Sequence, residues 1–137
     1  DVRNAPPRGP RQGAPSEARG FEDAMRQAGG AMRVLRRSDF SSGSAEADLG
    51  ALQAVQEALV TAKATFGEAP VSAQARERFG DDRAAYAAAF RQAVNASLRA
   101  ALDLEDAVLA GDAAAAARAR DALLASQKQA HDLFQED

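Results

Sequence analysis

The chain has 137 residues, a formal net charge of −3 at pH 7, one histidine and no cysteine. Without cysteine, disulfides, thiolate metal sites and thioether attachment of a cofactor are excluded. The mildly negative net charge argues against a concentrated basic surface of the kind that nucleic-acid binding needs. No apolar run approaches the roughly 18 residues of a membrane span. Abundant alanine without any isoleucine favours one domain of close-packed helices over a sheet.

Residues 1–20, "DVRNAPPRGPRQGAPSEARG", contain four of the five prolines and almost no large apolar residue. This composition predicts neither a helix nor a contribution to a core. One interpretation is a disordered or extended N-terminal tail. The other is an arm that docks on a partner through its arginines, which are Arg3, Arg8, Arg11 and Arg19.

The first helix is predicted from about residue 21 to residue 37 and opens with "FEDAM". Its apolar residues recur at spacings of four, three, four and three, which makes a single seam along one face; they are Phe21, Met25, Ala28, Met32 and Leu35. Gly29 and Gly30 weaken this helix by roughly 1 kcal/mol each. We interpret the pair as allowing close approach of a neighbouring helix.

The second helix is predicted over about residues 45–65, and "GEAP" at 67–70 ends it. Its seam has the same spacing and consists of Leu52, Val55, Leu59, Ala62 and Phe66. Residues 71–80 are compatible with a short helix or with an ordered loop, and the pattern does not decide between them.

The third helix is predicted over about residues 81–110, with a seam of Phe90, Val94, Ser97 or Leu98, Ala101, Leu104 and Val108. "AGD" at 110–112 predicts a tight joint in which Gly111 ends one helix and Asp112 caps the next. The fourth helix is predicted over about residues 113–134. Its seam consists of Leu124, Gln127 or Lys128, His131 and Phe134, so that His131 points inward or nearly so.

Four helices with short joints favour an all-α, antiparallel up-down-up-down four-helix bundle. In that topology the start of the first helix and the end of the last helix are neighbours at the same end. Met25 and His131 would then meet at similar depth, about 6 Å and 9 Å from their respective ends. A thioether and an imidazole that face each other are a known axial pair for haem iron.

From Phe21 to the end, the chain resembles the cytochrome b562 family. "FEDAM", "AKATFGEAP", "FRQAVN" and "QKQAHDLFQ" resemble that family's opening segment, second-helix end, third-helix haem-facing motif and last segment. The resemblance implies a haem-binding domain over residues 21–137 with one non-covalent haem b per chain. Met25 and His131 match the axial iron ligands, and Phe21, Ala28, Phe90 and Val94 match positions that would wall the haem.

The chain departs from the family pattern at several of these positions. Gln127 and Gln135 are neutral where the family often has basic residues near the haem propionates, and Ala130 and Val94 replace aromatic residues. These changes would loosen haem binding or alter the reduction potential, but they remove no axial ligand. Gln127 is therefore kept among the expected cofactor-binding residues.

With both axial positions filled, no site for a substrate remains, which predicts electron transfer to an unidentified redox partner rather than enzyme activity. The family resemblance and the missing initial Met indicate the bacterial periplasm. The main alternative is a haem-free bundle of the same fold that acts as an interaction or accessory subunit. Copper binding is a third possibility, although one histidine with Met25 and Met32 makes a poor site.

Overall fold

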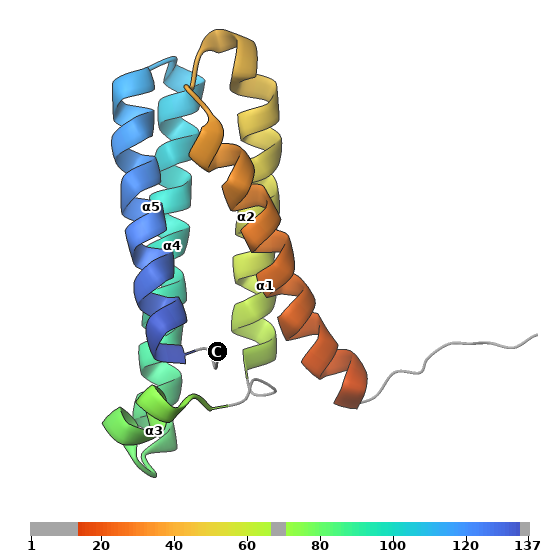
Figure 1. The fold of residues 1–137 in the computed structure, drawn as a ribbon, viewed down its shortest axis with the longest axis vertical. Helices are drawn as coiled ribbons and strands as arrows, with labels where there is room; N and C mark the ends of the chain where they lie inside the picture. Colours follow the sequence, from red (N-terminus) through yellow and green to blue (C-terminus); the bar gives the residue numbers. More distant parts are fainter. Residues whose placement is uncertain (1–13, 67–70, 135–137) are drawn as a thin grey trace, which may run out of the picture.

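The computed structural model describes residues 14–66 and 71–134, with side chains from residue 20 onward, and this part of the chain is all-helical without a strand. It contains four long helices, one short helix and one 3-10 turn (Figure 1). In chain order these are α1 (Ala14–Arg37), η2 (Ser42–Ser44), α2 (Ala45–Thr65), α3 (Ala73–Phe79), α4 (Arg83–Ala110) and α5 (Ala113–Phe134).

The first helix begins earlier than the sequence pattern predicts. α1 starts at Ala14 instead of residue 21, so the prediction that residues 1–20 form no helix is wrong for residues 14–20. Pro15 lies in the first turn, where a proline costs little because the backbone N–H groups there have no partner within the helix. Arg19 therefore belongs to α1, and Arg3, Arg8 and Arg11 lie outside the described residues.

The other helix boundaries follow local capping chemistry. α2 and α5 span the predicted residues, and the segment left open between helix and loop contains α3. α4 begins two residues later than predicted because Asp82 caps it, accepting a hydrogen bond from the backbone N–H of Ala85 at 2.9 Å. Gly111 ends α4 at a φ of 72°, and Asp112 caps α5 through the Ala115 N–H at 3.0 Å, as predicted.

The long helices pack mainly as α1 against α2 and α4 against α5, and α2 contacts α4 to join the two pairs. Alanine side chains form a separate small buried cluster that belongs to α1 and α2, consisting of Ala24, Ala28 and Ala58. Two polar bonds link α2 to α4: Gln56 donates to Glu105 at 2.7 Å and Lys63 donates to Asn95 at 2.8 Å. The buried hydroxyl of Ser97 on α4 lies 2.7 Å from that of Ser126 on α5.

The predicted seams supply most of the core, with one shift in α5. Leu35, Leu52, Leu104 and Leu123 are fully buried. In α5 the completely buried leucine is Leu123, whereas the predicted seam residue Leu124 is only half-buried. The two residues are 100° apart on a helix. Leu123 belongs to the main core, and α5 packs mainly against α4.

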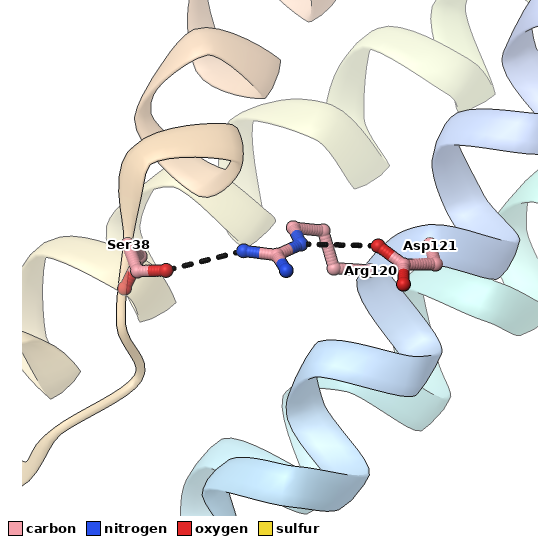
Figure 2. Close-up of polar contacts among 3 residues, drawn as sticks. All are labelled: Ser38, Arg120 and Asp121. Carbon is pink, nitrogen blue, oxygen red and sulfur yellow. Dashed lines mark hydrogen bonds and ion pairs between the residues drawn. The ribbon is translucent and has the colours of Figure 1, made fainter.

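α1 and α5 run in opposite directions and touch only sparsely, and the N-terminal half of α1 leans away from α5 (Figure 1). One contact ties them at the other end: Arg120 of α5 donates from a guanidinium nitrogen to the backbone carbonyl of Ser38 at 3.1 Å (Figure 2). The same guanidinium stacks 5.2 Å from the ring centroid of Phe40 and contacts Asp121. The two helices are therefore held together at one end and separate towards the other.

The end where α1 and α5 separate contains a cluster of aromatic rings. Phe90 is central, with ring centroids 3.8 Å from Phe66, 5.3 Å from Phe134 and 6.1 Å from Phe21. α3 lies across this end and is attached to α5 by the Ser72 hydroxyl, which donates to the carbonyl of Leu133. Within the described ranges, no helix combines the length and apolar character that a membrane span requires.

Candidate functional site

A cavity of about 450 Å³ opens between α1 and α5, where the two helices separate, and reaches inward to α2 and α4. Its α1 wall includes Met25, Ala28 and Gly29, and its α5 wall runs from Leu124 to Phe134. Leu59, Phe90 and Val94 are mostly buried residues that close its inner side. The volume lies within the range of about 300–1,000 Å³ that is usual for small-molecule and cofactor sites.

Met25 and His131 line this cavity from opposite helices. The tie between Ser38 and Arg120 provides a common reference for their depth. Met25 lies 13 residues before Ser38 and His131 lies 11 residues after Arg120, which correspond to about 20 Å and 17 Å along the two helices. The only histidine and one of the two methionines therefore lie at nearly the same level of one cavity.

Six of the seven residues that the sequence predicts for the cofactor site line this cavity. They are Met25, Ala28, Phe90, Val94, Gln127 and His131. The seventh, Phe21, is buried behind the cavity wall and contacts the ring of Phe90. Met32 is buried in the main core and does not line the cavity, which separates the two methionines into different environments.

His131 is exposed to solvent while it lines the cavity, so the prediction of an inward-pointing histidine is only partly right. It lies in the last turn of α5, with Lys128 one turn before it. The Lys128 ammonium donates to the carboxylate of Asp132 at 2.9 Å, so Asp132 already has a basic partner beside the histidine. Because His131 is exposed and also lines the cavity, it lies at the mouth of the cavity.

Several further residues line the cavity that the sequence analysis did not assign to the cofactor site, although it had named Lys128, Ser97 and Leu59 as seam residues. Arg36 lies eleven residues, about three turns, after Met25, and Lys128 lies three residues before His131. Both spacings return to the same helix face. Helical periodicity could therefore have predicted that Arg36 lies on the face of Met25 and Lys128 on the face of His131. Ser97 and Leu59 also line the cavity, and only the packing of α2 and α4 brings them there.

The chemical character of the cavity can be compared with what a haem requires. A haem needs an apolar slot for its macrocycle, axial donors for iron and cationic or polar groups for its carboxylates. The cavity has mainly aliphatic and aromatic walls, a thioether and an imidazole at one level, and two cations, Arg36 and Lys128. Among the described lining residues there is no carboxylate, so the residues present fit the group.

Other metal chemistry has less support in the described part of the chain. No three His, Cys, Asp or Glu side chains gather there into a group that could hold a metal ion. The acidic residues after the middle of α4 lie away from the cavity: Asp103 and Asp106 are exposed, and Glu105 is bonded to Gln56. A methionine–histidine pair is the remaining set of metal-binding side chains in this region.

Comparisons of the chain with protein-family models, with curated proteins and with solved structures gave no match. The resemblance to the cytochrome b562 family thus remains an expectation from the sequence alone.

Proposed function

We propose that the chain binds one haem b in the cavity between α1 and α5, with Met25 and His131 as axial ligands, and serves as an electron-transfer protein. The observation that carries this proposal is that both residues line one mainly apolar cavity, at nearly the same level when residues are counted from the Arg120–Ser38 bond. They are 106 positions apart in the sequence.

The proposal includes the bundle topology that such a site needs. We propose that α1, α2, α4 and α5 form an up-down-up-down four-helix bundle, with α3 as an insertion in the connection between the second and third long helices. The pairing of α1 with α2 and of α4 with α5, together with the short Gly111–Asp112 joint, supports this topology. The Arg120–Ser38 bond supports α1 and α5 as the remaining neighbours.

Each side chain then has a distinct role. His131 would bind through a neutral imidazole nitrogen and Met25 through its sulfur, and the absence of cysteine leaves the attachment non-covalent. Phe90, Val94 and Ala28 would exclude water from the macrocycle faces, and Phe21 would support Phe90 from behind. The bound group supplies one-electron chemistry at iron, and with two protein ligands in place it offers no position to a substrate.

The open mouth of the cavity agrees with electron transfer, since a cofactor edge near solvent can approach a partner. A redox partner protein and a periplasmic location complete the proposal, and both are inferred from the family resemblance. The proposal also includes docking of the N-terminal tail on a partner. Residues 1–13 of that tail lie outside the described residues.

A haem-free role as an interaction or accessory subunit is the second candidate. The observation in its favour is an exposed apolar stripe on α4, where Leu102 and Leu109 lie two turns apart and are 50% and 64% exposed. A helix face of this kind is suited to contact with another protein. It predicts a folded chain without any specific haem spectrum.

The decisive experiment is a titration of the purified protein with hemin, followed by absorption spectra of the oxidised and dithionite-reduced forms. Wild type is compared with Met25→Leu and His131→Ala. Met32→Leu serves as the matched control, because it replaces the other methionine, which is buried away from the cavity. We expect a sharp Soret band and reduced α band in wild type and Met32→Leu, altered in both ligand variants.

Two results would contradict the proposal. A wild-type spectrum identical to that of hemin in buffer would favour the haem-free accessory role. A specific spectrum that survives both Met25→Leu and His131→Ala unchanged would mean that haem is held by other ligands.

A further inference from the structure

We propose that Arg36 and Lys128 form a carboxylate-recognition site, so that the cavity selects a planar apolar ligand carrying carboxylates on the side of the cavity away from the α3 end. This inference rests on the proposed function and specifies the class and orientation of its ligand. It concerns two residues that do not coincide with Gln127 and Gln135, the positions considered from the sequence.

The first observation is the charge of the cavity in relation to the chain. The chain carries a net charge of −3, yet the two fully charged residues of the described cavity wall are both cations. An apolar cavity with cations at its edge and no lining carboxylate favours an amphiphilic anion over a neutral or cationic ligand.

The second observation is where these cations lie. Arg36 is about 16 Å beyond Met25 along α1, and Lys128 is about 4.5 Å before His131 along α5. Because the two helices run in opposite directions, both displacements point towards the end that is tied by Arg120 and Ser38. The backbone positions of Arg36 and Lys128 therefore lie on the same side of the Met25–His131 level.

Helix geometry strengthens this placement. Side chains on a helix lean towards its N-terminus, so the long Arg36 side chain is directed along α1 towards Met25. The Lys128 ammonium instead points towards the C-terminal end of α5, where it donates to Asp132, and it would have to turn back along α5 to approach Arg36. The guanidinium offers paired donors that match a carboxylate, and the ammonium adds a second positive charge.

The ion pair between Lys128 and Asp132 does not prevent this role. Its side chains are 77% and 59% exposed, and exposed pairs contribute little to stability. Asp132 does not line this cavity. Lys128 can therefore exchange one carboxylate for another at small cost when a ligand enters.

The test uses metal-free protoporphyrin IX, which has the carboxylates but no iron, and its dimethyl ester, which has neither iron nor charge. Binding of each is measured by fluorescence for wild type and for the double variant Arg36→Gln/Lys128→Gln. The control is Arg33→Gln/Arg118→Gln, which removes the same charge from exposed positions of α1 and α5 outside the cavity. Circular dichroism checks that all three proteins have the same helix content.

We expect the cavity double variant to bind the free diacid roughly three- to tenfold more weakly than wild type, and added salt to reduce this difference. The control variant should retain wild-type affinity, and the dimethyl ester should bind all three proteins alike. Equal affinity of the cavity double variant and wild type for the diacid would overturn the inference. So would an equal loss for the ester, or no porphyrin binding by wild type.

The outcome is independent of iron ligation. Loss of diacid binding in the cavity double variant, together with hemin spectra insensitive to Met25→Leu and His131→Ala, would support the carboxylate site and contradict the axial ligands. The reverse pattern would support the ligands and contradict this inference.

Discussion

Two polar side-chain atoms in the described part of the chain are buried without a hydrogen-bond partner, one oxygen of Asp48 and the hydroxyl of Tyr86. The other oxygen of Asp48 accepts hydrogen bonds from the hydroxyls of Ser38 at 2.9 Å and Ser44 at 2.8 Å. Asp48 therefore holds the connection between α1 and α2 in shape, next to the tie from Arg120 to Ser38. Tyr86 has no such compensation and packs between Phe66, Phe79 and Phe134.

Removal of the Tyr86 hydroxyl should stabilise the protein. Tyr86→Phe keeps the ring contacts and deletes a buried group without a partner, so we expect the free energy of unfolding to rise by about 1 kcal/mol. Urea unfolding at pH 7 measures this change. A loss of stability in Tyr86→Phe would mean that the hydroxyl contributes an interaction in solution.

The difference in stability between wild type and Tyr86→Phe should also depend on pH. Burial raises the pKa of Tyr86 above its ordinary value of about 10. The folded state therefore favours the neutral phenol, and this contribution to stability is complete below pH 10 and is lost as the pH rises through the folded pKa. Wild type should lose stability relative to Tyr86→Phe in alkaline solution, which unfolding curves from pH 8 to 11 would reveal.

At the scale of elements, α1 contains two helix-weakening glycines, Gly29 and Gly30, and also forms one wall of the cavity. A Cβ atom on Gly29 would meet nothing within 4 Å, and one on Gly30 would approach only the end of the Arg33 side chain at 3.8 Å. The glycines therefore do not serve close helix packing, and the interpretation made from the sequence is wrong on this point. Close approach of α1 to α2 comes from Ala24, Ala28 and Ala58 instead.

The substitutions Gly29→Ala and Gly30→Ala distinguish an effect on helix stability from an effect on ligand binding in the cavity. Each should stabilise the ligand-free protein by up to about 1 kcal/mol, because alanine favours the helix and neither position has a clash. Gly29 lines the cavity and Gly30 does not. Hemin affinity should therefore change in Gly29→Ala and stay at the wild-type value in Gly30→Ala, as measured by titration.

Equal hemin affinities for the two glycine variants and wild type would argue against a ligand that fills the cavity as far as α1. A loss of stability in Gly29→Ala would show that the open space beside this residue closes in solution.

At the scale of the whole molecule, the fold is closed at one end and open at the other. Arg120, Ser38 and Phe40 link α5 to the α1–α2 connection at the closed end. α1 and α5 have few contacts with each other, and the cavity lies where the N-terminal half of α1 leans away from α5 (Figure 1). A ligand that contacts both helices would replace the missing helix contacts, so binding and stability should be coupled.

We expect the haem-loaded protein to be clearly more thermostable than the apo form. With free hemin at a hundred times its Kd, binding adds about 2.7 kcal/mol, which raises Tm by roughly 10 °C for a domain of this size. Thermal melts followed by circular dichroism measure this, with His131→Ala as the variant that should show a much smaller shift. Equal melting temperatures of the apo and loaded forms would contradict the coupling.

The sequence by itself determined the helical class, the limits of α2 and α5 and the Gly111–Asp112 joint, because seam periodicity and caps are local properties that the chain displays directly. The start of α1 was not predictable in this way, since a proline in a first turn is compatible with a helix or with a tail. The periodicity also predicted that Met25 lies on the apolar face of the first helix and that His131 lies on that of the last helix.

Only the tertiary structure decided what those faces enclose. The divergence of α1 from α5 leaves a cavity at the level of Met25 and His131, and the tie at Arg120 sets the relative depth of the two helices. Arg36 and Lys128 became part of the same wall for that reason, and Phe21 fell behind it. Helix faces follow from sequence spacing, whereas the distance and tilt between two helices depend on the side chains of every helix packed around them.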